Sequence, residues 1–157
     1  PSVGTSLVNG TSNVSVASSG NVTVGVGGTA NMLVITSSDV LANGLSVGTK
    51  IIPQNSQSAN YTLVLTDSGK QIFHPSADTT ARTFTIPANG TVAYDVGTSI
   101  TFINQASAGN VSIAITTDTM RLAGNGATGT RTLTANGVAT AIKITSTEWI
   151  ISGVNLT

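Results

Sequence analysis

The sequence lacks cysteine and is poor in charge. Only 8% of its 157 residues are Asp, Glu, Lys or Arg, against about 25% in typical soluble domains. Without cysteine, the chain has no disulfide, zinc–thiolate site or thiol nucleophile. Six basic and six acidic residues cancel to a formal net charge of +0, so no basic excess is present to neutralise nucleic-acid phosphates or an anionic membrane surface. Such a chain is weakly protected against association by self-repulsion, which suits a protein inside an assembly.

Long apolar runs and helical periodicity are also missing. No run approaches the roughly 18 apolar residues of a membrane-spanning helix, and no basic region followed by an apolar one marks a signal peptide. We therefore expect neither nucleic acid nor membrane insertion. No window places apolar residues at helical spacing over three turns, whereas Thr, Val and Ile dominate. These patterns predict an all-β chain.

The N-terminal part alternates valine with small polar residues. This period of two predicts short strands at 13–17, 21–26 and 32–36, with valines on one face and Ser/Thr on the other. Valine-sized side chains bury little area, and an isolated hairpin is marginally stable, so this segment needs a partner. We expect residues 1–52 to be a docking or trimerisation segment. The valines expected at its interface are Val14, Val16, Val22, Val24 and Val26.

Two parts of this segment stay open in the sequence. Residues 1–12 are polar and are either an ordered arm or a loose terminus. Within the ambiguous stretch 39–52, Val40–Ala42 fits a helical turn, Asn43-Gly44 a turn and Leu45–Ile52 a strand. The partner of the valine strands is likewise either the downstream domain or the same segment of neighbouring chains.

The C-terminal part predicts an antiparallel β-sandwich or jelly-roll-like domain. Residues 53–60 are polar and without period, and we take them as the linker to a domain at 61–157. Short strands at regular spacing, separated by Gly- and Asn-rich turns, indicate such folds. Asn89-Gly90 predicts a hairpin between strands at 82–86 and 91–96. Asn136-Gly137 predicts a second turn, between strands at 131–135 and 138–145.

No motif in the chain predicts catalysis, a cofactor or a metal. Gly124–Gly129 (GNGATG) matches the dinucleotide pattern by letter, but a Thr-rich, strand-like segment follows it in place of the required helix. His74 is the only histidine and lacks the neighbours of a familiar metal site. No Gly-x-Ser-x-Gly elbow accompanies it. The six acidic residues are scattered, with no sign of a facing carboxylate pair. We expect a protein that is not an enzyme.

Large aromatic side chains are rare, which makes Tyr94 and Trp149 the candidates for contact with a glycan. On a surface, either ring could stack on a sugar. In the interior, each would fill the core. The sequence favours at least partial burial of Trp149, which lies in the last predicted strand, at the end of the domain.

The C-terminal part resembles a module that recurs in structural proteins of tailed bacteriophages. The resemblance lies in Tyr61–Lys70 (YTLVLTDSGK), Ile86–Pro87 with Val92–Ile100, Ala108–Ala114, and Ala139–Gly153 with its Glu-Trp-Ile-Ile-Ser-Gly close. Upstream, Gly20–Thr36 is similar to repeats of phage fibre proteins. The family is recognised by architecture and has no catalytic motif to transfer.

The resemblance implies a virion surface protein, such as a capsid decoration, head-fibre or tail-fibre component, usually trimeric. Its partners would be itself, as a homotrimer, and other virion proteins such as the major capsid or tail proteins. It would assemble in the cytoplasm of the bacterial host. The short length and Pro1, which fits removal of an initiator Met, favour a decoration or head-fibre protein. The alternative is a receptor-binding module that recognises a host-surface glycan.

Overall fold

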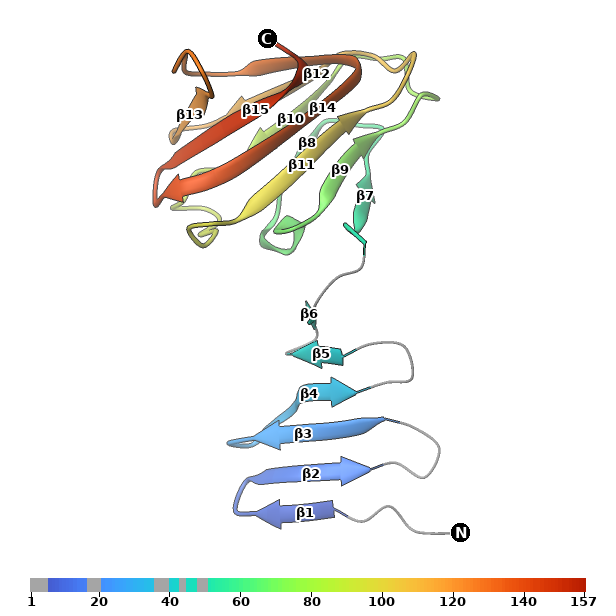
Figure 1. Cartoon of the computed structure of the whole chain (residues 1–157), viewed down its shortest axis with the longest axis vertical. Coiled ribbons are helices and arrows are strands. Elements are labelled where there is room, and N and C mark those ends of the chain that lie inside the picture. The colour runs from blue at the N-terminus through green and yellow to red at the C-terminus, as the bar shows by residue number, and fades with distance from the viewer. Residues whose placement is uncertain (1–5, 17–20, 36–39, 43–44, 48–50) are drawn as a thin grey trace. The chain divides into compact units, whose positions relative to one another are not determined.

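The computed structural model describes residues 6–16, 21–35, 40–42, 45–47 and 51–157. They form two compact units, residues 1–51 and 52–157, and each is described by itself. Both units are built from strands (Figure 1), so the predicted all-β class is confirmed. Within the described residues, no helix is long and apolar enough to cross a membrane.

The described residues of the N-terminal unit form one sheet of six antiparallel strands that follow one another in chain order. Its strands are β1 Ser6–Asn9, β2 Ser12–Val16, β3 Val22–Val26, β4 Thr29–Ile35, β5 Val40–Ala42 and β6 Leu45–Ser46. Val40–Ala42 is thus a strand and not a helical turn. Part of the N-terminal arm is also a strand, while residues 1–5 lie outside the described part of the chain.

The C-terminal unit contains the remaining strands and one short 3-10 helix, η1 Leu65–Asp67. The strands are β7 Gln54–Ser56, β8 Tyr61–Thr62, β9 Gln71–His74, β10 Arg82–Ile86, β11 Ser99–Asn104, β12 Val111–Ile115, β13 Thr119–Leu122, β14 Arg131–Thr145 and β15 Glu148–Leu156. Strand β14 pairs antiparallel with β11, β12 and β15, whereas β7–β9, β9–β11, β8–β10, β10–β12 and β13–β15 are parallel. The pairing is therefore mixed and not antiparallel throughout.

Strand β14 joins two groups of strands into a sandwich-like fold. Its start, at Arg131–Leu133, pairs with β12, and its later part, at Gly137–Ile142, pairs with β11. Between them the chain bulges, with a φ of 61° at Asn136. A Cβ on Gly137 would lie 2.6 Å from the Thr134 carbonyl oxygen, so the bend needs glycine there. The predicted turn at Asn136-Gly137 is therefore a bulge inside one long strand.

The core of this unit lies between the two groups of strands. Fifteen buried apolar residues form one cluster, drawn from Leu63 after β8, from β9 to β15 and from the loops between these strands. Inward positions alternate along β11, where Ile100, Phe102 and Asn104 are buried and the residues between them are only partly so. Across the layers, the rings of His74 and Phe84 meet edge to face at 6.1 Å. The predicted sandwich-like architecture is confirmed at this level.

Two local predictions were wrong. The expected linker at 53–60 contains β7, which pairs with β9, because Asn55 faces the interior and donates to the Asp67 carboxylate at 2.9 Å. A polar edge strand carries no apolar alternation, so no pattern of residues predicts it. The residues after Asn89-Gly90 form no strand, and β10 pairs with β8 and β12 in place of its chain neighbour.

Candidate functional site

The candidate site is the apolar face of the N-terminal sheet. Residues directly opposite on neighbouring antiparallel strands point to the same face. One row across the sheet is Leu7, Val14, Val24, Leu33 and Ala42, and the next is Val16, Val22, Ile35 and Val40. We call these residues, with Val26, the valine face. The row Ser15, Thr23, Val34 and Leu41 points to the opposite side, which is therefore polar on β2 and β3 and apolar on β4 and β5.

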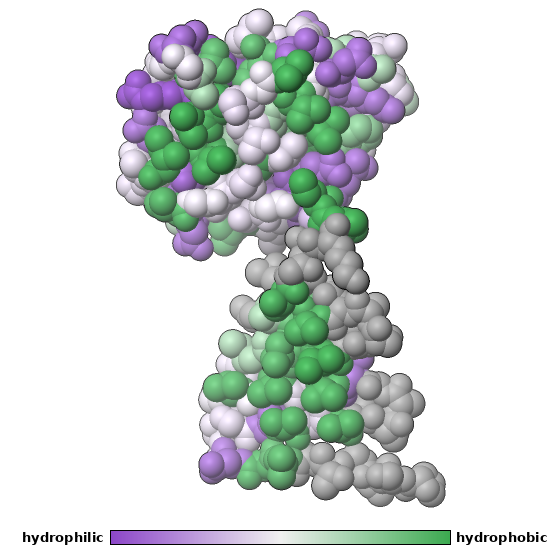
Figure 2. All heavy atoms as spheres, viewed as in Figure 1, coloured by the Kyte–Doolittle hydropathy of each residue, from purple (hydrophilic) through white to green (hydrophobic). Residues whose placement is uncertain are grey.

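Among the described residues of its own unit, no second apolar layer covers the valine face. Among the described residues of this unit only Gly25 is buried. Leu7 is 75% exposed and Val26 is 54% exposed. Figure 2 shows apolar side chains gathered on one face of this unit. A one-layer sheet with an apolar face normally packs against a second layer, because burial of that face is what stabilises it.

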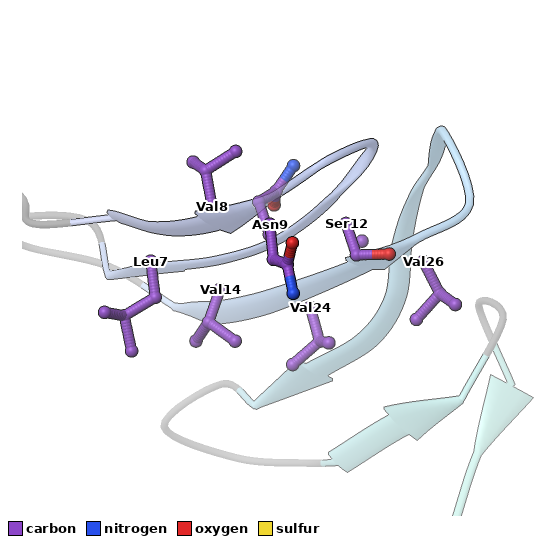
Figure 3. A pocket seen from close by; sticks show the side chains of 9 residues that line it. Leu7, Val8, Asn9, Ser12, Val14, Val24 and Val26 are labelled. Carbon is purple, nitrogen blue, oxygen red and sulfur yellow. The ribbon is translucent and has the colours of Figure 1, made fainter.

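A hollow of about 400 Å³ lies over strands β1 to β3. Figure 3 shows that Leu7, Val14, Val24 and Val26 project to one side of the ribbon and Val8 to the other. The remaining residues around the hollow are Asn9, Ser12, Asn13 and Gly25. Neither acid nor base is among them, so the hollow favours an apolar occupant over a charged one.

The sequence around the valine face carries no formal charge on its side chains. Residues 1–38 contain no Asp, Glu, Lys, Arg or His. Two copies of such a surface meet without like-charge repulsion. No partner can be selected there by ion pairs with these residues, so apolar area and shape must decide what binds.

The structure brings all five predicted interface valines together on one face. Val14 lies opposite Val24, and Val16 lies opposite Val22, while Val26 continues β3 on the same side. The predicted separation of valines from Ser/Thr is therefore confirmed. That they form an interface stays a prediction.

Sequence reasoning missed the other members of the valine face. Leu33 and Ile35 sit in the continuous apolar run Met32–Ile35, where no alternation tells one side from the other. Leu7 stands next to Val8 for the same reason. Only the register, which places Leu33 opposite Val24 and Leu7 opposite Val14, assigns them to the face.

Tyr94 and Trp149 belong to the core of the C-terminal unit. Trp149 is 0% exposed and Tyr94 is 4% exposed, and their rings meet edge to face at 5.5 Å. The Tyr94 hydroxyl donates to the Val64 carbonyl oxygen at 2.6 Å, and burial raises the pKa of this phenol. Neither ring face is open to a sugar, so the proposed glycan contact through these residues is corrected.

The only histidine is a buried structural residue at the end of β9. Its Nε2 lies 3.1 Å from Asp78 Oδ2, and Arg82 donates to the same carboxylate through Nε at 2.7 Å. Hydrogen bonds from Arg82 hold the pKa of Asp78 well below its usual range, and those from His74 and the Thr80 backbone act in the same direction. These groups hold the loop between β9 and β10. No serine hydroxyl is among the described hydrogen-bond partners of His74.

A second buried carboxylate, Asp67, is equally occupied with structure. It accepts hydrogen bonds from the Tyr61 hydroxyl at 2.8 Å, from Asn55 Nδ2 at 2.9 Å and from the Val64 backbone at 2.9 Å. Burial and this carboxylate raise the pKa of Tyr61. The network fixes η1 against β7 and β8. It leaves no carboxylate pair facing a cleft.

The C-terminal unit also has a polar hollow beside β13. Its volume is about 560 Å³. It is lined by Ile115, Thr116, Asp118, Thr119, Met120, Arg121, Thr128, Gly129 and Thr130. Part of the Gly124–Gly129 motif forms its rim, and strand β14 follows that motif, so no helix N-terminus is available for a pyrophosphate. Within the described part of the chain, no three His, Cys, Asp or Glu residues gather as metal ligands.

Comparisons with protein-family models, with curated proteins and with solved structures find no match to this chain.

Proposed function

We propose that this chain is a structural protein of a phage virion surface that assembles as a homotrimer through its valine face. The observation that carries the proposal is the valine face itself, an apolar sheet surface over which the described part of the unit places no second layer. The resemblance of the sequence to phage structural modules supplies the virion, the trimer and the partners, namely the major capsid or tail proteins. Assembly takes place in the cytoplasm of the bacterial host.

A second copy of the chain is the occupant that these observations favour. The C-terminal unit has a closed core of its own, in which Phe84 and Trp149 are fully buried. Its core needs no further layer of protein to cover it. Residues 1–38 have no charged side chain, so two copies meet there without charge repulsion. A different protein would find no charge in this stretch with which to form an ion pair. Burying one Val side chain contributes about 1.5–3 kcal/mol, so a few valines from each copy suffice for a stable contact.

Light scattering of the full chain tests this proposal. We expect the mass of a trimer for the natural sequence. Val24→Lys should dissociate it, because a lysine in the middle of the face would be buried without a counter-ion. Ser15→Lys adds the same charge to the opposite side of the sheet and should leave the trimer intact.

The proposal fails if the natural chain is a monomer at micromolar concentration, or if both lysine variants behave alike. Unchanged thermal unfolding of the C-terminal unit in both variants shows that the substitutions act on assembly. A monomer would favour the free-standing binding module.

A second candidate function is recognition of a host-surface glycan, and the polar hollow beside β13 favours it. Threonine hydroxyls, the Asp118 carboxylate and the Arg121 guanidinium are groups that hydrogen-bond sugar hydroxyls. A glycan array with Arg121→Ala as the comparison tests it. Binding that Arg121→Ala weakens would support a receptor role, and an array without hits would remove it.

A further inference from the structure

Lys143 is a fully buried lysine in the C-terminal unit. It lies on β14, continues the inward row of Ala139 and Ala141, and is 1% exposed. Lysine is almost never fully buried unless it is paired. Among the described residues, no carboxylate oxygen lies within 4.0 Å of its Nζ. An ordinary salt bridge therefore does not explain its position.

The polar partner of this lysine is the side-chain amide of Asn89. The Lys143 Nζ lies 2.6 Å from Asn89 Oδ1, and the two residues are 54 positions apart. Because a C=O bond is about 1.2 Å long, Nζ is at most about 3.8 Å from Asn89 Cγ. This is close to the 3–3.5 Å at which a bound nucleophile and its target are poised to react.

The surroundings of the pair include a buried aromatic ring and a carboxyl group. The ring of Trp149, itself fully buried against Tyr94, has its centroid 5.6 Å from Nζ. Trp149 Nε1 is buried with no hydrogen-bond partner in the described part of the chain. Asp118 Oδ2 accepts the backbone N–H of Asn89 at 3.0 Å. A fully buried amine thus meets a partly buried carboxamide, whose own backbone is held by a carboxylate.

We propose that Lys143 and Asn89 join in an intramolecular isopeptide bond. The neutral Lys143 amine attacks Asn89 Cγ, a C–N bond forms, and the bond from Cγ to Nδ2 breaks. One proton passes from Nζ to Nδ2, and Nδ2 leaves as ammonia, while Asp118 holds Asn89 in position through its backbone N–H. The sum is amine plus carboxamide giving a secondary amide plus ammonia, and it needs no oxidant, cofactor or added water.

Such a bond would tie the loop after β10 to strand β14. Along the polypeptide, the path from Asn89 to Lys143 passes through strands β11, β12 and β13 and most of β14. The chain has no cysteine, so no disulfide can do this. The inference is independent of the proposed assembly, because every residue in it lies within the unit 52–157.

Mass spectrometry of the purified full chain tests the bond directly. We expect an intact mass lower than that of the sequence by one ammonia. A tryptic digest should contain one branched peptide that holds both Asn89 and Lys143, with no cleavage after Lys143. Two separate linear peptides together with the full mass would overturn the proposal, whatever the variants do.

Three variants separate the bond from other losses of ammonia. Lys143→Met and Asn89→Ala should both show their full sequence masses, and Asp118→Ala should form the bond many times more slowly. Lys70→Met removes a lysine outside the core and should keep the loss of ammonia. Because Asn89 precedes Gly90, a cyclic imide between them would also release ammonia. A loss that persists in Lys143→Met would therefore overturn the isopeptide bond.

Discussion

His74 Nδ1 lies 3.0 Å from Oδ1 of Asn104, and the orientation of that amide is fixed by the backbone. Asn104 Nδ2 donates to the carbonyl oxygens of Gly109 at 2.9 Å and Leu133 at 3.0 Å, so Oδ1 must be the acceptor. His74 Nδ1 therefore donates, while Nε2 faces the Asp78 carboxylate. The two ring nitrogens thus connect β9 to the Asn104 amide on one side and to the Asp78 carboxylate on the other.

Asn104→Ala should destabilise the C-terminal unit by about 3 kcal/mol. The substitution leaves two carbonyls and the His74 N–H without partners inside the core, and each unsatisfied buried group costs about 1–3 kcal/mol. Chemical denaturation followed by Trp149 fluorescence measures the loss. Asn125→Ala is the control, because Asn125 is exposed and accepts only the Ala127 backbone N–H. A loss below 1 kcal/mol would contradict the network.

Asp78 should make the fold sensitive to acid. Its pKa is lowered in the folded chain, chiefly by hydrogen bonds from Arg82. A lowered carboxyl pKa contributes stability that is complete above the ordinary value, about 3.9, and is lost as pH falls below that value toward the folded one. The free energy of unfolding of the natural chain should fall between pH 6 and pH 2. That of the Asp78→Asn variant should fall less steeply over the same range. Asp95→Asn, at an exposed position, controls for net charge.

Gly109→Ala should destabilise the unit by about 2–3 kcal/mol. A Cβ at this position would lie 2.4 Å from both the carbonyl carbon and the oxygen of Thr80, and this neighbour is backbone that cannot rotate away. Gly90→Ala is the matched control, since a Cβ there meets nothing within 4 Å and its φ is not positive. Melting temperatures of the two variants decide the question. Equal melting temperatures would show that the loop of Thr80 moves freely.

A fragment of residues 52–157 should fold alone as a monomer. All fifteen residues of its core cluster come from within these bounds, and the valine face lies outside them. Its melting temperature should match that of the C-terminal transition in the full chain. If the fragment forms the same oligomer as the full chain, the contact between copies lies within residues 52–157. That result would contradict the proposed role of the valine face.

The features that the sequence alone predicted are those that depend on the periodicity and composition of short stretches. The alternation at Val14–Val16 and Val22–Val26 predicted two strands. It also predicted which residues share a face of the sheet, and so the five interface candidates. Gly- and Asn-rich turns gave the all-β class and most strands of the C-terminal unit. These features are local, and in strands the local pattern directly reports the face.

Features that depend on distant neighbours were beyond the sequence. Asn89-Gly90 has the letters of a hairpin turn, yet Asn89 instead reaches Lys143, 54 residues away. Trp149 and Tyr94 could fill a core or bind a sugar until their burial was known. Strand β7 escaped detection because its inward residue is polar and is matched to Asp67, a partner that only the fold supplies.

The simple order of strands β1 to β6 has a consequence for when the N-terminal sheet forms. Each of its pairings joins strands that are neighbours in the chain, whereas β9 must find β11 and β11 must find β14. Contacts between nearby residues form faster than distant ones, and N-terminal parts leave the ribosome first. We expect the valine faces of chains growing on one messenger to meet while their C-terminal units are still being made. Assembly would then begin among sister chains during synthesis, before finished molecules diffuse apart.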